Sequence, residues 1–168
     1  MGIGLRFSFD TSVFIEMERR YPRSENAKLW EVIEAKLRSG DILVSSEVIL
    51  ELKAVSVPTI GNWIDTTFPR SVIDSDASIQ NIVSELVNKY EGWIDPHSTS
   101  NTADPYVIAV AKRYAGGVVT LERPNINLLN NPEQIANQTH ALKIPNVCSL
   151  ESIACLDIVR YLVEIGSY

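Results

Sequence analysis

Short apolar runs and helically spaced apolar positions alternate along the chain. The short runs are rich in Val, Ile, Leu and Phe and are bounded by polar or turn-forming residues, which is typical of buried strands. Such runs cover residues 5–9, 41–46, 71–73, 118–120 and 146–148. We therefore expect a strand at each of these positions, with 71–73 the weakest because it is short and flanked by polar residues.

Between these runs, apolar residues recur at the spacing of an amphipathic helix. The helical segments are 11–20, 27–40, 47–55, 59–68, 76–93, 149–166 and one that runs from 104 to the glycine pair at 116–117. The Asn-rich segment 125–140 lacks a clean period and is expected to be a surface loop with a turn of helix. The alternation of strands and helices predicts a three-layer α/β/α sandwich with a mostly parallel central sheet. With no repeat or linker, residues 1–168 are expected to form a single domain.

Composition narrows the class of protein. Of the 168 residues, 45% are hydrophobic and 21% are charged, which is ordinary for a globular protein with a core. No apolar run is long enough for a membrane span, and the first residues do not resemble a signal peptide, so we expect a cytoplasmic protein without a membrane partner. Cys148 and Cys155 make no metal-ligand pattern with either histidine and are expected to be core residues.

The net charge of −6 argues against a protein that coats nucleic acid by bulk positive charge. It does not exclude a nuclease, because acids that hold cations contribute negative charge of their own. Basic residues that are candidates for phosphate contacts are scattered, and Arg123 is the best placed of them. The others are Arg6, Lys53, Lys112 and Arg113.

Acidic residues recur where the predicted strands end. Asp10 follows the first strand, Glu51 lies on the helix after the second, and Asp104 stands at the start of a later helix. Glu122 follows the fourth strand, two residues after Thr120. The carboxyl ends of parallel strands lie along one edge of a sheet, where ligands bind, so these acids are expected to converge.

Each acid also has a plain structural explanation. Asp10 and, more strongly, Asp104 before Pro105 suit helix N-caps. Glu47 suits the positive end of a helix, Glu51 suits a solvated helix face, and Glu122 in a loop is uninformative alone. It is the joint pattern that favours a site, because solubility does not require acids at one edge of the sheet.

The order of several motifs resembles a PIN-like domain, and in particular a PIN-like group catalogued as a domain of unknown function. The motifs are FDTSVFIEMERRYP, GDILVSSEVILELK, ADPYVIAVA, VVTLE and KIPNVC. The resemblance implies a metal-dependent endoribonuclease with Mg²⁺ or Mn²⁺ bound by Asp10, Glu51, Asp104 and Glu122. It further implies that Thr120, Thr11 or Ser12 orients water or metal.

VapC-like members of this superfamily are toxins of toxin–antitoxin pairs, so the resemblance also implies an RNA substrate, an antitoxin protein and a homodimer. Asp10 and Asp104 are expected to be the main ligands, because carboxylate oxygens are what Mg²⁺ and Mn²⁺ prefer. The chain departs from the family pattern at Glu122, where most PIN nucleases carry Asp. Mg²⁺ demands near-ideal octahedral geometry. The side chain of Glu122 is one methylene longer than that of Asp, so the change affects the binding of a second metal ion most.

Rival functions remain open at this point. Phosphoacceptor domains also place an Asp after a strand, but the dehalogenase type needs a second Asp at position 12, which is Ser. The receiver type needs Lys-Pro at the end of the last strand, whereas Lys143 and Pro145 precede it. A PIN-like module that binds without cutting fits better than either, and a purely structural role for the acids fits least.

Overall fold

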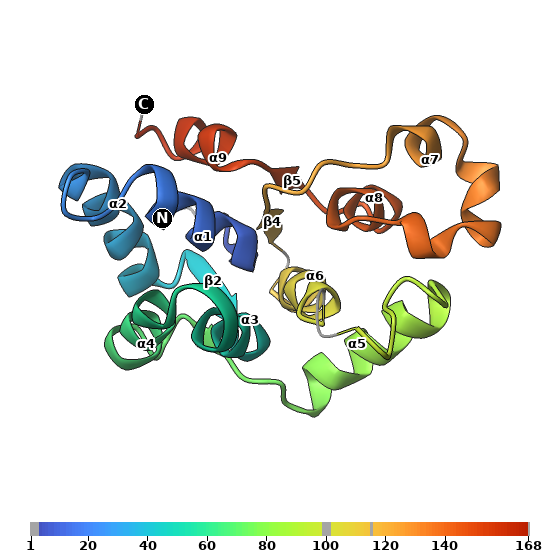
Figure 1. Cartoon of the computed structure of the whole chain (residues 1–168), viewed down its shortest axis with the longest axis horizontal. Helices are drawn as coiled ribbons and strands as arrows, with labels where there is room; N and C mark the ends of the chain where they lie inside the picture. Colours follow the sequence, from blue (N-terminus) through green and yellow to red (C-terminus); the bar gives the residue numbers. More distant parts are fainter. Residues whose placement is uncertain (1–3, 99–101, 115, 168) are drawn as a thin grey trace.

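The central feature of the computed structural model is a five-stranded sheet in which every strand pair is parallel (Figure 1). The structure describes residues 4–98, 102–114 and 116–167. The strands are β1 (Phe7–Phe9), β2 (Ile42–Ser45), β3 (Val72–Ile73), β4 (Gly117–Val119) and β5 (Cys155–Leu156), in the order β3-β2-β1-β4-β5. The predicted sandwich is confirmed, and even the weakest expected strand, 71–73, is present.

Helices cover both faces of this sheet. In Figure 1, α1 to α4 and α9 lie on one side, and α5 to α8 lie on the other. Their bounds are α1 (Thr11–Arg20), α2 (Ala27–Ser39), α3 (Ser46–Glu51), α4 (Pro58–Thr67), α5 (Ala77–Lys89), α6 (Asp104–Arg113), α7 (Ile126–Asn130), α8 (Ile144–Leu150) and α9 (Ile158–Glu164). No helix in the described residues is long and apolar enough to cross a membrane.

The strand order contains a topological switch point between β1 and β4. The chain runs outward from β1 through β2 to β3, and then returns to the other side of β1 to form β4. In open parallel sheets, ligands bind at the carboxyl edge beside such a switch point. The pairing of Phe9 with Val119 places the residues that follow both strands, Asp10 and Thr120, side by side at this edge.

The core holds the inner strands by aromatic and aliphatic packing. Phe7 and Phe9 alternate with Ser8 and point to the same face, where both pack edge-on against Tyr161 of α9 with ring centroids 5.3 and 5.0 Å apart. Phe9 also contacts Phe14 of α1. These contacts attach the first and last helices to the strand that leads into Asp10.

Two predictions near the C-terminus were wrong. Residues 146–148, expected as a strand, lie inside α8, because Pro145 occupies the first turn and the Asn146 side chain accepts the backbone N–H of Lys143. A short apolar run does not distinguish a strand from a buried helix. The expected helix 149–166 is interrupted by β5, since Ser152 has a left-handed backbone (φ 56°) that ends the preceding helix.

Two other segments differ in detail from the expected elements. The helix expected at 47–55 is α-helical only to Glu51 and continues as a π-helical turn over Leu52–Ser56. Such π turns occur frequently at functional sites. The Asn-rich segment carries α7 and two 3₁₀ turns, Pro132–Asn137 and Thr139–Ala141, so it is more helical than predicted.

Gly116→Ala is expected to destabilise the fold, because a Cβ at this position would collide with the backbone carbonyl of Arg6. That carbonyl accepts the Gly117 N–H at 3.0 Å, so it is not free to move away. We expect a loss of about 1–3 kcal/mol in the free energy of unfolding, measured by urea denaturation. Gly4→Ala is the control, since its Cβ would make an ordinary 3.4 Å contact with Asp41. Equal stability of the two variants would contradict the prediction.

Candidate active site

Asp10 is the central acid of the switch point. It follows β1 directly, and only 5% of it is exposed. One of its oxygens, Oδ2, accepts the hydroxyl of Ser12 at 2.6 Å and the hydroxyl of Thr120 at 2.9 Å. Asp10 occupies the N-cap position of α1, as predicted, but its side chain makes no capping hydrogen bond there. Its carboxylate is directed to the site rather than to its own helix.

The same two hydroxyls also bind the backbone after β4. The Ser12 oxygen accepts the N–H of Leu121 at 3.1 Å, and the Thr120 oxygen accepts the N–H of Glu122 at 3.1 Å. Each hydroxyl therefore donates to Asp10 and accepts from the loop. The result is a closed network that fixes the loop carrying Glu122 against the N-terminus of α1.

Glu51 is held at the last α-helical position of α3. Its carboxylate accepts the hydroxyl of Thr11 at 2.6 Å and, on the other oxygen, the backbone N–H of Ala103 at 3.3 Å. Glu51 is not the freely solvated side chain that its position between two leucines also allowed. It connects α1 and the start of α6, which places it beside Asp104.

Asp104 is the first residue of α6, and only 6% of it is exposed. The prediction that it is the N-cap was wrong, because Ala103 takes that position. A helix that leads into a parallel strand runs antiparallel to it, so the N-terminus of α6 lies at the same edge as the end of β1. Asp104 therefore reaches the acidic site from the helix that precedes β4.

Burial and three neighbouring carboxylates raise the pKa of Asp104 to about 9. Burial contributes most, followed by the charges of Glu122, Asp10 and Glu51, while the charge of Lys143 opposes the rise. Burial also raises the pKa of Asp10, against the hydrogen bonds from Ser12 and Thr120. The four predicted acids thus interact electrostatically, although they come from four separate parts of the chain.

Glu122 lies at the rim of the site and has a partner of its own. Its Oε2 accepts the backbone N–H of Ile144, the first residue of α8, at 2.9 Å. Its charge raises the pKa of both Asp10 and Asp104. Glu122 is therefore close enough to influence both buried acids while one of its oxygens is bound to α8.

The four carboxylates are suitable ligands for a divalent cation, but their side chains are not arranged around a common point. Carboxylates crowded in a buried site repel each other, and a hard cation such as Mg²⁺ or Mn²⁺ relieves that repulsion. Within the described residues, however, no three acidic, histidine or cysteine side chains are grouped so that they could hold a metal ion as they stand. Binding an ion would require the acidic side chains to rotate toward a common point, and Glu122 would have to share or leave Ile144.

Two further acids near the carboxyl edge of the sheet have other partners and do not join the four acids of the site. Glu47 interacts with Ser75 instead (3.4 Å), and Asp76 caps α5 by accepting the N–H of Ile79 at 2.9 Å. Sequence reasoning missed Lys143 as a component of the site. Lys143 is the N-cap of α8, and its charge opposes the rise in the pKa of Asp104.

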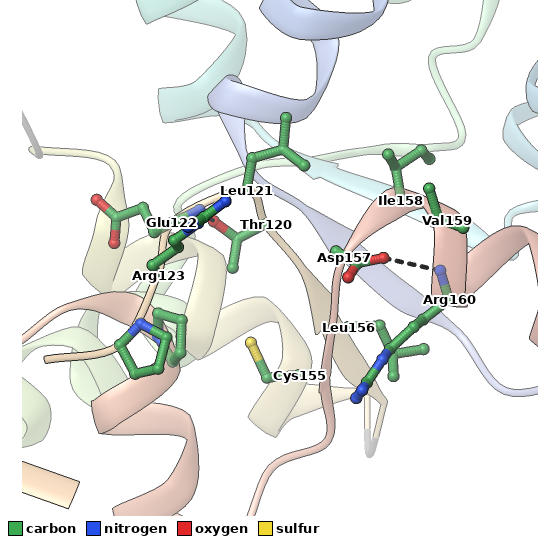
Figure 2. Close-up of a pocket in the computed structure, with 12 residues that line it drawn as sticks. Thr120, Leu121, Glu122, Arg123, Cys155, Leu156, Asp157, Ile158, Val159 and Arg160 are labelled. Carbon is green, nitrogen blue, oxygen red and sulfur yellow. Dashed lines mark hydrogen bonds between the residues drawn. The ribbon is translucent and has the colours of Figure 1, made fainter. Parts of the chain in front are cut away.

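A pocket of about 500 Å³ opens beside the acidic cluster and shares Thr120 and Glu122 with it. In Figure 2, residues 120–123 and 157–160 face each other across this pocket, and the Cys155 sulfur lies between them. Cys155 is half-buried rather than a core residue as predicted, whereas Cys148 is fully buried. The pocket lies at the carboxyl ends of β4 and β5, on the side of Asp10 away from α3.

Comparison with protein families places the chain in a family without a described activity. A family model described as "Domain of unknown function (DUF4411)" covers residues 7–167, nearly the whole chain. No curated protein matches the sequence. The matched range includes every acid of the candidate site.

Without divalent ions, the free energy of unfolding is expected to fall as the pH rises from 5 to 8. The unfolded chain releases the Asp104 proton near pH 3.8, whereas the folded chain keeps it up to about pH 9. Stability from this proton is complete below the unfolded pKa and is lost progressively up to the folded one, with a slope of at most about 1.4 kcal/mol per pH unit.

Urea denaturation in EDTA at several pH values measures this slope. Asp104→Asn has no proton to release and should show a flatter profile, while Glu47→Gln, a change on an acid outside the cluster, should keep the wild-type slope. Parallel profiles for wild type and Asp104→Asn would contradict the prediction.

Proposed function

Since the chain belongs to the DUF4411 family, whose description names no activity, we propose its function from the site: a metal-dependent endoribonuclease that hydrolyses RNA phosphodiester bonds. The observation that carries this proposal is the group of four acids at the switch point. Buried, mutually repelling carboxylates are unfavourable for folding and are found mainly where chemistry needs them. The two acids that we propose as the main ligands of Mg²⁺ or Mn²⁺, Asp10 and Asp104, are the most buried of the four.

The side chains of the site have two roles, positioning the acids and holding the ion. Ser12 and Thr120 hold the Asp10 carboxylate by one oxygen, and Thr11 and the Ala103 N–H hold Glu51. Asp10, Asp104 and Glu51 would hold the ion, and Glu122 would hold a second ion or act through water. When bound, the ion supplies positive charge that stabilises the reacting phosphate and promotes deprotonation of the attacking water.

Asp104 explains why metal and activity would be coupled. Without a cation, its raised pKa keeps it protonated at neutral pH, and a protonated carboxyl is a poor metal ligand. Asp104 would have to lose that proton to hold a divalent ion, and it would then be in its charged form. Activity should therefore require metal and rise with pH.

The biological role follows from the PIN-like order of motifs. We propose that the protein acts in the cytoplasm as the toxin of a toxin–antitoxin pair, as a homodimer, and cleaves to leave a 5′-phosphate and a 3′-hydroxyl. The net charge of −6 suits an antitoxin with a basic binding segment. This part of the proposal rests on the resemblance and on charge, whereas the nuclease rests on the site.

A second function is favoured by one contact. The Glu122 carboxylate accepts the Ile144 N–H at 2.9 Å, and Glu stands where most PIN nucleases carry Asp. If that contact persists with metal present, the fourth acid is lost to the site. The chain would then be a weak or inactive PIN-like module that binds RNA or a protein partner for regulation.

Cleavage of structured RNA, including transfer RNA, is expected with Mg²⁺ or Mn²⁺ and not with EDTA. Asp104→Asn should lower the rate by roughly a hundredfold or more, since a bound metal supplies several kcal/mol of charge stabilisation. Single-turnover assays on labelled RNA, resolved on gels, measure the rates. Glu47→Gln is the matched control, because it removes an acid from the same helix as Glu51 and should keep the wild-type rate.

The outcomes separate the two functions. Cleavage that stops with EDTA and with Asp104→Asn supports the nuclease. No cleavage with any metal, from a folded protein that still binds RNA or a partner, favours the binding module. In that case Glu122→Asp is the informative variant, since restored cleavage would identify Glu122 as the cause.

Metal binding should also increase the stability of the folded protein. At tenfold excess of Mg²⁺ over its dissociation constant, the free energy of unfolding should rise by about 1.4 kcal/mol. Asp104→Asn should remove most of this gain, and Glu47→Gln should retain it. Urea denaturation with and without Mg²⁺, together with titration calorimetry, measures the effect; equal gains in wild type and Asp104→Asn would place the ion elsewhere.

A further inference from the structure

The pocket beside the acidic cluster has features that the chemistry of the four acids does not use. It is bounded on one side by the loop after β4 and on the other by the start of α9. A volume of about 500 Å³ lies in the range of small-molecule sites. Because it shares Thr120 and Glu122 with the cluster, the pocket adjoins the acidic site.

Two arginines line opposite sides of this pocket. Arg123 follows Glu122, and Arg160 lies in the first turn of α9, across the pocket (Figure 2). Within the described residues, neither guanidinium forms an ion pair, whereas Lys36, Lys53 and Arg38 are each paired with an acid. Both guanidinium groups are therefore available to contact an anionic ligand in this pocket.

Asp157 also lines the pocket, and it forms no ion pair with Arg160 within the described residues. Asp157 is the N-cap of α9, and its carboxylate accepts the backbone N–H of Arg160 at 2.8 Å (Figure 2). The carboxylate is thus directed to the helix backbone. The guanidinium of Arg160 remains available in the pocket.

The rest of the wall is largely apolar. Leu121 and Pro124 line the β4 side, and Leu156 and Ile158 line the β5 side. A flat apolar ring can lie against such a wall, and guanidinium planes also stack on nucleic-acid bases. The combination of apolar surface with two arginines matches a nucleotide, which has one flat ring system and a phosphate on either side.

We infer that this pocket binds the unpaired nucleotide next to the scissile bond, with Arg123 and Arg160 contacting its flanking phosphates and the apolar wall contacting its base. This inference rests on the proposed nuclease function, because the acids define which bond is cut. The substrate must then be single-stranded at this position, since a base held within a duplex is not free to enter a pocket.

Binding of a fluorescein-labelled, eight-nucleotide single-stranded RNA tests the inference. Fluorescence anisotropy is measured with Ca²⁺ in place of Mg²⁺, and gels check that the RNA stays intact. Arg123→Ala and Arg160→Ala should each weaken binding about tenfold, the effect of losing one charged hydrogen bond. Each should also reduce the slope of log affinity against log salt by about 0.7.

Arg19→Ala is the matched control. Arg19 is an exposed arginine in the last turn of α1, which runs antiparallel to the strands, so it lies at the opposite edge of the sheet. This variant should bind RNA as the wild type does. The inference would be overturned if Arg123→Ala and Arg160→Ala bound RNA as tightly as Arg19→Ala does, or if the folded wild-type protein bound no RNA. It would also be overturned if the two variants lost as much affinity for blunt duplex RNA as for the single strand.

Cys155 provides a second readout that does not depend on activity. It lines the pocket, whereas Cys148, the other cysteine in the sequence, is fully buried. Saturating RNA should slow alkylation of Cys155 by iodoacetamide at least about fivefold if RNA covers the pocket, and Cys155→Ser gives the background. Unchanged alkylation at saturation would place the RNA elsewhere and overturn the inference.

The failure of the nuclease proposal is distinguishable from failure of this inference. If wild type does not cut but Arg123→Ala and Arg160→Ala lose binding, the pocket still binds RNA and the catalytic proposal fails. If wild type cuts and the two variants bind like Arg19→Ala, the nuclease stands and the pocket assignment fails.

Discussion

One oxygen of Asp10 joins the two halves of the parallel sheet at the edge where the site lies. Its Oδ2 accepts hydroxyls from Ser12, on the helix after β1, and from Thr120, after β4. Both hydroxyls also bind the backbone of the β4 loop. The position of Glu122 therefore depends on Asp10, and so does the pocket wall that continues from it.

The site gathers like charges that a stable fold would keep apart. Burying Asp104 near Asp10, Glu51 and Glu122 raises its pKa to about 9. Buried charges without compensation destabilise proteins, so such departures from good packing are expected mainly at functional sites. The hydroxyl and backbone donors around Asp10 and Glu51 reduce this destabilisation. They carry no full positive charge, so they do not neutralise the carboxylates as a bound cation would.

Much of the fold could be predicted from local pattern, and the failures have local causes. The expected strands at 5–9, 41–46, 71–73 and 118–120 are present because each is a short apolar run ending in polar residues. The C-terminal region was assigned wrongly, because residues 146–148 suit a strand and a buried helix equally well. The break at Ser152, a left-handed backbone position without glycine, has no clear signal in the sequence.

The sequence by itself determined the order of elements up to β4 and the acids at the ends of the strands, because periodicity and turn residues act over short distances. The tertiary structure alone decided how those acids are held: the Thr120–Asp10 hydrogen bond spans 110 residues, and the Ile144 N–H reaches Glu122 only because α8 begins there. It also decided that Asp104 is not a cap, that Lys143 lies near it, and that Arg123 and Arg160 share a pocket. Contacts between distant segments depend on how strands pair and helices cross, and no local pattern encodes that geometry.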